Sequence, residues 1–270
     1  MTVKSSLAAA LLLACIAAAP TASAAQPGKA PPDPTRDPLM TTAGFLSSHP
    51  DLRYRLLGLE RMRDGKAKEA FEFFKRAAYY ADKPAQGMVA EMLWNGQGTE
   101  ADPALAYAWM DLAAERGYKG FAGLRERYWS KLDEQQRARA VEEGRTVYAT
   151  YGDEAAKPRL ATVLRRERMR MTGSRLGTVG NLKIYVPGPD GEGIAIDGSK
   201  FYDERYWNPD KYLQWHDDIW MEPRIAKVDV GELTQVEQPK PESRIPEVSP
   251  IIDAEEPKTE DAMPRVGDKP

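Results

Sequence analysis

The side chains that could support catalysis or metal binding are few in this sequence. Its 270 residues include two histidines, His49 near the N-terminus and His216 within Trp215-His216-Asp217-Asp218. A serine hydrolase needs a histidine beside a nucleophile motif, and neither histidine has one nearby. A helical zinc site uses histidines four residues apart, which His216 lacks. Acidic residues are abundant, but abundance does not identify a glycosidase-like carboxylate pair. We therefore expect a non-catalytic protein without a metal or other cofactor.

The only cysteine, Cys15, lies in an N-terminal export signal. A short positive start precedes the apolar run Leu7 to Ala19, and small residues follow it. Residues 1–25 thus resemble a secretory signal peptide, whose apolar run is too short to span a bilayer. Two interpretations of Cys15 stay open. Leu12-Leu13-Ala14-Cys15 resembles the lipobox of bacterial lipoproteins, whereas cleavage after Ala22-Ser23-Ala24 removes the only thiol. We expect an exported, periplasmic protein, with a lipid anchor through Cys15 as the alternative.

Proline-rich segments flank the expected folded part. Residues 26–42 carry five prolines, and residues 235–270 carry seven prolines, many acidic residues and no aromatic residue. Such compositions disfavour regular structure and bury too little apolar surface to offset the entropy of ordering. We expect a disordered tether at 26–42 and a disordered acidic tail at 235–270.

Between these ends the sequence repeats itself. Small and bulky residues recur at an offset of 36 residues, which indicates an array of similar structural units. Small residues match small ones and bulky residues match bulky ones. The matching positions are Ala70, Phe73, Phe74, Ala77 and Ala78 in the first unit and Ala106, Trp109, Met110, Ala113 and Ala114 in the second.

The second unit predicts an antiparallel pair of helices. Ala85, Val89 and Met92 lie on one face of the first helix. Gly96 and Gly98 permit the tight backbone that ends it, and Asp102 before a proline is a capped helix start. This unit closely resembles the Sel1-like repeat, a relative of the tetratricopeptide repeat. The resemblance is carried by an alanine-glutamine start at Ala85-Gln86 and by Gly96, Gly98, Asp102, Ala106, Trp109, Ala113, Ala114 and the closing Gly117.

The neighbouring units are less regular. The first, roughly Asp51 to Lys83, has a shorter turn at Asp64-Gly65, and the third begins at Lys119. Asp133, with Gln136 three residues later, predicts a capping box at the start of a polar closing helix. We therefore expect a short α-solenoid with its capping helix over residues 43–152.

Residues 153–234 predict a different kind of structure. The segment Lys157 to Arg175 holds seven basic residues against Glu167 alone. It is either a solvated helix face or a dock for an anionic surface, such as lipid headgroups, an acidic partner or the acidic tail itself. Alternating apolar residues around Ile184 and Ile196 predict a β-hairpin, and an aromatic-rich stretch follows from Phe201 to Trp220. We expect a small C-terminal α+β module with an aromatic core.

The resemblance implies that the protein acts by binding other proteins, as Sel1-like proteins commonly serve as adaptors. The leading hypothesis is a monomeric scaffold for a protein or peptide partner in the cell envelope, with no role for nucleic acid. Trp94 and Asn95, beside the variable turn, are the candidate contact residues. The alternative is a glycan- or peptidoglycan-binding protein that uses the C-terminal aromatic residues, and an enzyme is a third, weaker hypothesis.

Overall fold

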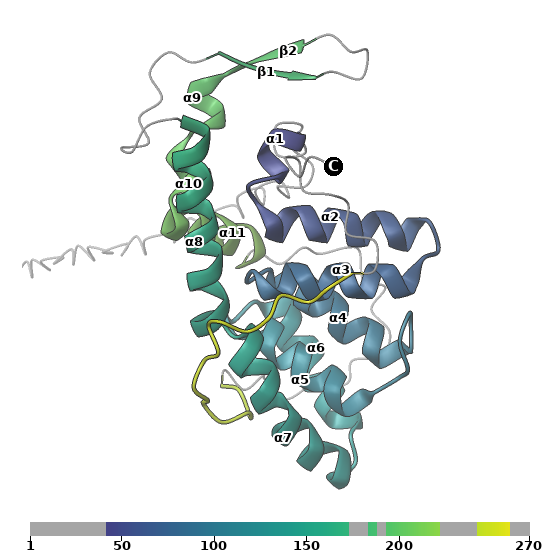
Figure 1. Cartoon of the computed structure of the whole chain (residues 1–270). Coiled ribbons are helices and arrows are strands. Elements are labelled where there is room, and N and C mark those ends of the chain that lie inside the picture. The colour runs from purple at the N-terminus through teal and green to yellow at the C-terminus, as the bar shows by residue number, and fades with distance from the viewer. Residues whose placement is uncertain (1–41, 173–182, 188–192, 222–241, 260–270) are drawn as a thin grey trace, which may run out of the picture.

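The computed structural model describes residues 42–172, 183–187, 193–221 and 242–259 of the chain. Within these ranges helices dominate, and consecutive helices pack side by side (Figure 1). The prediction of a mainly helical fold of packed helix pairs is confirmed. The helices of the stack are α1 (Ala43–Leu46), α2 (Pro50–Arg63), α3 (Ala67–Tyr79), α4 (Lys83–Asn95), α5 (Pro103–Ala113), α6 (Lys119–Lys131), α7 (Glu134–Tyr151) and α8 (Asp153–Thr172).

The hairpin of α4 and α5 forms where the sequence predicts it. Asp82 caps α4 by accepting a hydrogen bond from the backbone N–H of Ala85 at 2.7 Å. Asp102 caps α5 in the same way, by accepting a hydrogen bond from the backbone N–H of Leu105 at 3.0 Å. Helix α4 ends at Gly96, which adopts the left-handed conformation with φ of 65°. Capping carboxylates start helices and left-handed glycines end them, so both boundaries follow from these residue types.

Helix α5 lies at the centre of the stack. It packs against α4, α6 and α7, and every residue from Ala106 to Ala113 is buried. A helix that is apolar on all sides can be stable only when other elements surround it. The small side chains of Ala106, Ala108 and Ala113 allow the neighbouring helices to approach closely.

Helix α7 begins with the predicted capping box. The Asp133 carboxylate accepts from the N–H of Gln136 at 2.8 Å, and the Gln136 side chain accepts from the N–H of Asp133 at 3.0 Å. Ala140, Gly144 and Val147 are its buried residues. Since α7 packs along α5 and then leads into α8, it contributes to the core of the stack as well as to its end.

The remaining elements lie alongside α8 and beyond its end (Figure 1). Strands β1 (Lys183–Pro187) and β2 (Gly193–Asp197) pair antiparallel, with Ile184 opposite Ile196, as the alternating pattern predicts. Helices α9 (Gly198–Phe201), α10 (Glu204–Trp207) and α11 (Pro209–Met221) follow. Their aromatic side chains share one core with the start of the stack, so this region has no separate aromatic core. We call this core the aromatic junction; it comprises Phe45, Leu52, Leu160, Leu164, Phe201, Tyr202, Tyr206, Trp207 and Tyr212.

The prediction of a disordered C-terminal segment is wrong for residues 242–259, which we call the tail. The tail crosses the stack in an irregular, largely extended path (Figure 1) and contacts helices from all three units. Composition misled the prediction because folding of this segment depends on anchoring groups that other helices supply. Its only deeply buried apolar side chain is Ile245, which is 6% exposed.

Several predicted segments lie outside the described residues. These are the signal peptide at 1–25 with Cys15, the tether apart from its last residue, and the parts of the acidic segment at 235–241 and 260–270. Among the helices that the structure describes, none combines the length and the apolar character needed to cross a membrane.

Candidate protein-binding site

The two contact residues predicted from the sequence lie at the turn after α4. The Trp94 ring stacks on Tyr128 of the third unit, with centroids 4.1 Å apart and planes 18° from parallel. Trp94 is therefore half-buried and links two repeat units, while the neighbouring Asn95 is exposed. No partner is present at this turn, so its binding role stays a prediction.

The repeat-motif residues shape the helix pair rather than a surface. Gly96, Gly98 and Gly117 have φ values of 65°, 75° and 75°. At Gly98 a Cβ atom would lie 2.4 Å from the backbone carbonyl of Ala67, so the turn packs directly on the first unit. Asp102 caps α5, and the remaining motif residues are buried in the core: Ala106, Trp109, Ala113 and Ala114.

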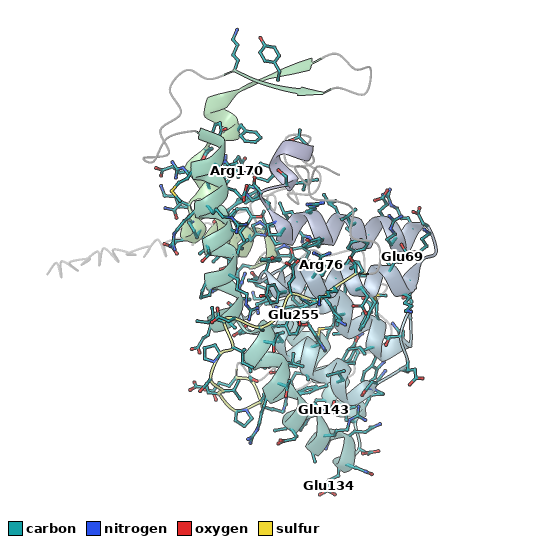
Figure 2. All side chains as sticks on the ribbon, viewed as in Figure 1. Glu69, Arg76, Glu134, Glu143, Arg170 and Glu255 are labelled. Carbon is teal, nitrogen blue, oxygen red and sulfur yellow. The ribbon has the colours of Figure 1, made fainter. Side chains whose placement is uncertain are left out.

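A different surface already holds a peptide, namely the tail. We call the helix residues that contact the tail the tail site. The tail begins beside α5 and α6, passes α7 and the start of α8, and then crosses α3. Arg76 and Glu255 mark this crossing in Figure 2, whereas Glu69 lies at the opposite end of α3. The tail thus connects the third repeat unit to the first.

The first anchor of the tail is Arg244. Its guanidinium donates two hydrogen bonds to the two carboxylate oxygens of Glu126, at 2.9 and 2.5 Å, in the bidentate geometry that favours arginine. The same guanidinium lies 4.7 Å from the centre of the Trp129 ring, a cation–π distance. Burial would raise the pKa of Glu126, but hydrogen bonds from Arg244 and Arg125 outweigh it and lower the pKa. Glu126 therefore stays an anion that can hold the arginine.

Residues on either side of Arg244 reach further into the stack. The Ser243 hydroxyl donates to the buried carboxylate of Asp111, which also accepts from Tyr148 at 2.8 Å. Ile245 lies against Gly144 of α7, where a Cβ atom would lie 2.4 Å from the end of the Ile245 side chain. The missing side chain of Gly144 therefore makes the space that Ile245 fills.

The middle of the tail is held by its backbone. Arg159 donates to the carbonyl oxygens of Ile251 at 2.6 Å and Ile252 at 2.8 Å, and the N–H of Ile251 donates to the carbonyl of Ala149 at 2.7 Å. The Tyr79 hydroxyl donates to the carbonyl of Ala254 at 2.6 Å. Contacts to backbone groups do not depend on the side chains of the bound segment. This part of the site can therefore hold an extended chain of varied sequence.

The second anchor is Glu256. Its carboxylate accepts two hydrogen bonds from Arg76, at 2.7 and 3.1 Å, and one from the Tyr80 hydroxyl at 2.9 Å. Burial and the adjacent Glu256 raise the pKa of Tyr80, so its hydroxyl keeps the proton that it donates. Arg76 also donates to Tyr54 at 2.6 Å, which fixes the guanidinium between α2 and α3.

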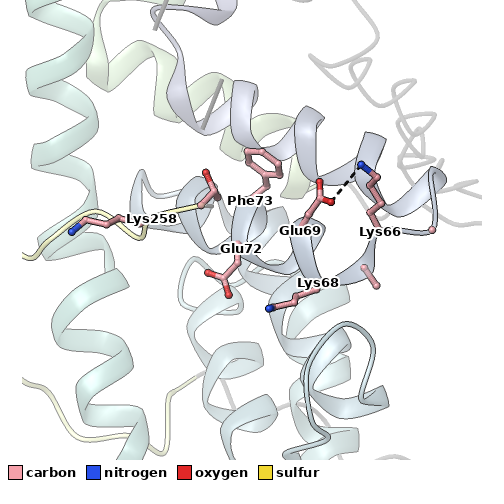
Figure 3. A pocket seen from close by; sticks show the side chains of 9 residues that line it. Lys66, Lys68, Glu69, Glu72, Phe73 and Lys258 are labelled. Atoms are coloured by element: carbon pink, nitrogen blue, oxygen red, sulfur yellow. Dashed lines mark ion pairs between the residues drawn. The ribbon is translucent and has the colours of Figure 1, made fainter. Parts of the chain in front are cut away.

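The tail leaves two hollows along its path. The first, of about 530 Å³, lies between residues 246–250 and the helices, and Glu115, Tyr148 and Glu154 contribute to its lining. The second, of about 650 Å³, begins at Lys258 and Thr259 and runs to the start of α3. Figure 3 shows Lys258 at one end of this second hollow and Lys66 and Lys68 at the other. The tail is therefore held at its two anchors and at residues 251–254, and it leaves space beside residues 246–250 and beyond Glu256.

Sequence reasoning missed most of the tail site. One signal is present in the basic segment Lys157 to Arg175, for which a dock for the acidic tail is one of the predicted roles. Arg159 of this segment does hold tail carbonyls. Further along α8, Arg166 and Arg170 are largely exposed and share Glu167. A second signal is the set of isolated apolar residues in an acidic, proline-rich segment, Ile245, Ile251 and Ile252.

Both histidines are buried. His49 lies under the aromatic junction, with its ring nitrogens 2.8 Å from the carbonyl oxygens of Phe45 and Tyr206. His216 is buried, and the adjacent Asp217 turns away to pair with Arg116 at 3.2 Å and with the Tyr118 hydroxyl. In the part of the chain that the structure describes, no group of three or more histidine, cysteine or acidic side chains is arranged to hold a metal.

The comparisons with known proteins agree with the helical geometry. Residues 55–79 and 83–118 match the family model described as Sel1 repeat. The chain contains Sel1-like repeats. The two matched segments cover the α2–α3 and α4–α5 pairs, and repeats of this family typically serve as scaffolds for protein interaction rather than as catalysts. No curated protein and no solved structure matches the chain.

Proposed function

We propose that the protein is a non-catalytic scaffold of the cell envelope that binds a partner protein through the tail site. The observation that carries this proposal is the tail itself, an extended segment held by side chains from all three repeat units. A surface that binds one extended segment by a bidentate arginine pair, backbone hydrogen bonds and a clamped glutamate has the groups needed to bind another.

The other elements support this role by bracing the stack. The C-terminal helices α9 to α11 and the middle of α8 join the start of the stack at the aromatic junction. Two and a half repeats are few for a stable array, because each pair buries its apolar face only against its neighbours. We propose that residues 153–221 act as a C-terminal addition that supplies the missing contacts.

The location in the envelope rests on the sequence of residues 1–25. A positive start, an apolar run and a small-residue cleavage site are the features that direct export. We propose a periplasmic protein that acts as a monomer, and the exposed arginines of α8 are the groups that would contact a membrane surface.

Glycan binding by the aromatic stretch has less support. Stacking on sugar rings requires exposed aromatic faces, and five rings of this stretch are at most 7% exposed. They are Phe201, Tyr202, Tyr206, Trp207 and Tyr212.

Photo-cross-linking in living cells tests the proposal and separates the two candidate surfaces. The cross-linking residue p-benzoylphenylalanine replaces Tyr79 in the tail site or Asn95 at the turn after α4. These positions lie at opposite ends of the α3–α4 pair, because the two helices run antiparallel. We expect a defined envelope protein to be cross-linked from position 79, and the cross-link to disappear when Arg76→Ala is added.

Two other outcomes contradict the proposal in different ways. Cross-links from position 95 alone would support the turn at Trp94 and Asn95 and remove the tail site as the binding surface. Absence of any intermolecular cross-link from both positions, with the chain folded and exported, would argue against a scaffold function.

A further inference from the structure

The chemistry of the tail defines what the tail site recognises. Arg244 and Ile245 fill the first anchor, and Glu256, twelve residues further along the chain, fills the second. Between these anchors the site holds backbone carbonyls and one backbone N–H, so it selects the spacing and the extended conformation more than the intervening side chains. The pattern is an arginine followed by an apolar residue and then, at a fixed distance, a carboxylate.

The tail is an incomplete occupant of this surface. It leaves hollows of about 530 and 650 Å³ along its path, and most of its own side chains, including Glu247, Ile251 and Glu255, are exposed. A segment with the same anchors and with side chains that fill these hollows would bury more surface than the tail does. Such a segment would displace the tail without changing the fold of the helices.

We propose that residues 242–259 are a tethered competitor for the partner, and that the partner binds through an extended segment with the same pattern. That segment carries an arginine beside an apolar residue and a glutamate about twelve residues further on. This inference rests on the proposed function, because it identifies the partner's chemistry and the regulation at the same site. In the resting protein the tail covers the site, and the partner gains access only when it displaces the tail.

Mass action makes the competition strong. A segment attached to the same chain competes at an effective concentration on the order of 1 mM, whatever its intrinsic affinity. A free peptide with the tail's own sequence should therefore bind the intact protein poorly, even though it fits the site. Loss of the tail's anchors should remove this competition and reveal the intrinsic affinity.

The experiment uses the full-length mature chain and a fluorescent peptide with the sequence of residues 242–259 as the probe. Three chains are compared by fluorescence anisotropy: the wild type, the release variant Arg244→Ala/Glu256→Ala, and the control Glu255→Ala. Glu255 is the matched control because it neighbours Glu256 but pairs only with the exposed Lys258 among the described residues. Far-ultraviolet circular dichroism checks that all three chains keep the same helix content.

We expect the release variant to bind the probe at least tenfold more tightly than the wild type, and Glu255→Ala to match the wild type. Adding Arg76→Ala to the release variant should abolish the gain. Equal binding to the wild type and to the release variant would overturn the competition while leaving a peptide-binding site in place. Absence of binding to the release variant would overturn the inference and also remove the tail site from the proposed function.

Discussion

The C-terminal part of the chain returns to the repeat stack in two places, and the two contacts differ in kind. At the aromatic junction, interlocking rings such as Phe201, Trp207 and Tyr212 are almost completely buried. At the tail site, an extended segment is held by ion pairs and hydrogen bonds, with Ile245 as its one deeply buried apolar side chain. The first contact resembles a protein core, and the second resembles a bound peptide.

This difference indicates which of the two contacts can open while the protein stays folded. A buried aromatic cluster contributes several kcal/mol and is lost only on unfolding. An ion pair or backbone hydrogen bond to the tail can instead be replaced by the same contact to another segment. The side chains of Arg76 and Glu256 are 10% and 23% exposed, and those of Arg244 and Glu126 are 18% and 14% exposed. We therefore expect the junction to stay closed in the folded protein and the tail to be displaceable.

The largest expected effect concerns the junction. Trp207 is 1% exposed, and its indole N–H donates to the carbonyl of Phe201 at 2.7 Å. Trp207→Ala should lower the free energy of unfolding by about 3–5 kcal/mol, because it leaves a large cavity and an unpaired carbonyl. Urea denaturation measures the loss. Arg205→Ala on the same short helix is the control, since Arg205 is exposed and should change stability by about 0.5 kcal/mol or less.

A pair of glycine substitutions compares a fixed contact with an exchangeable one. Both Gly58 of α2 and Gly144 of α7 face an apolar side chain, and a Cβ atom would lie 2.6 Å from the Phe74 ring and 2.4 Å from Ile245, respectively. Gly58→Ala should destabilise the protein by about 1–3 kcal/mol, because Phe74 is fully buried and has no room to move.

Gly144→Ala, in contrast, should not lower the stability of the protein. Alanine favours a helix over glycine by about 1 kcal/mol, and the tail can move away from the new methyl group. We expect unchanged or slightly raised stability, because the tail can leave the surface. The 242–259 probe should bind the release variant more weakly when Gly144→Ala is added, since the probe's own Ile245 loses the space that Gly144 leaves. A loss of stability at Gly144 as large as that at Gly58 would mean that the tail belongs to the fixed core.

Acid should weaken the junction before it affects the tail site. Burial lowers the pKa of His49 to about 4, although hydrogen bonds to two backbone carbonyls partly offset this effect. Burial and the nearby charges of Arg55 and Arg116 lower the pKa of His216 well below its usual value. Both rings take up protons in the unfolded chain near pH 6.5, so stability falls as the pH drops below that value. Asp51 acts in the opposite direction, because burial raises its pKa to about 6 and the folded state then holds the extra proton.

Two histidines against one carboxyl group leave a net loss of about 1.4 kcal/mol per pH unit between about pH 6 and 5. Asp51→Asn removes the opposing contribution and keeps an acceptor for the Tyr212 hydroxyl, which donates to Asp51 at 2.7 Å. The variant should therefore lose stability about twice as steeply over this range. Urea midpoints at pH 7.5, 6.5, 5.5 and 5.0 measure both slopes, and parallel slopes would contradict the assignment of Asp51.

The sequence predicts the parts of this fold that depend on local signals. Asp102 before a first-turn proline, Gly96 after α4, and the Asp133–Gln136 box each determine a helix boundary through neighbouring residues. The 36-residue repetition adds the pairing of the helices. These features act over a few residues, or recur at a fixed spacing, and are therefore visible without a structure.

The tail site could not be predicted in this way, because its partners are far apart in the sequence. Arg244 is 118 residues from Glu126, and Arg76 is 180 residues from Glu256. Gly144 carries no signal of its own, since it acts by leaving space for Ile245. Composition predicts that the tail cannot fold alone, and its placement on the stack depends on groups that distant helices supply.

The smallest expected effect concerns the acidic hollow beneath the middle of the tail. Glu115, Glu154 and the tail's own Glu247 line it. The negative charge of Glu247 therefore lies beside two other carboxylates, where a positive side chain would be attracted. A probe peptide carrying Glu247→Lys should bind the release variant about two- to fivefold more tightly than the unchanged probe, which corresponds to about 0.4–1 kcal/mol. The gain should disappear in 1 M salt, because screening removes attraction between exposed charges. Equal affinities at low salt would mean that the hollow does not select charge, and the partner's pattern would then be limited to its two anchors.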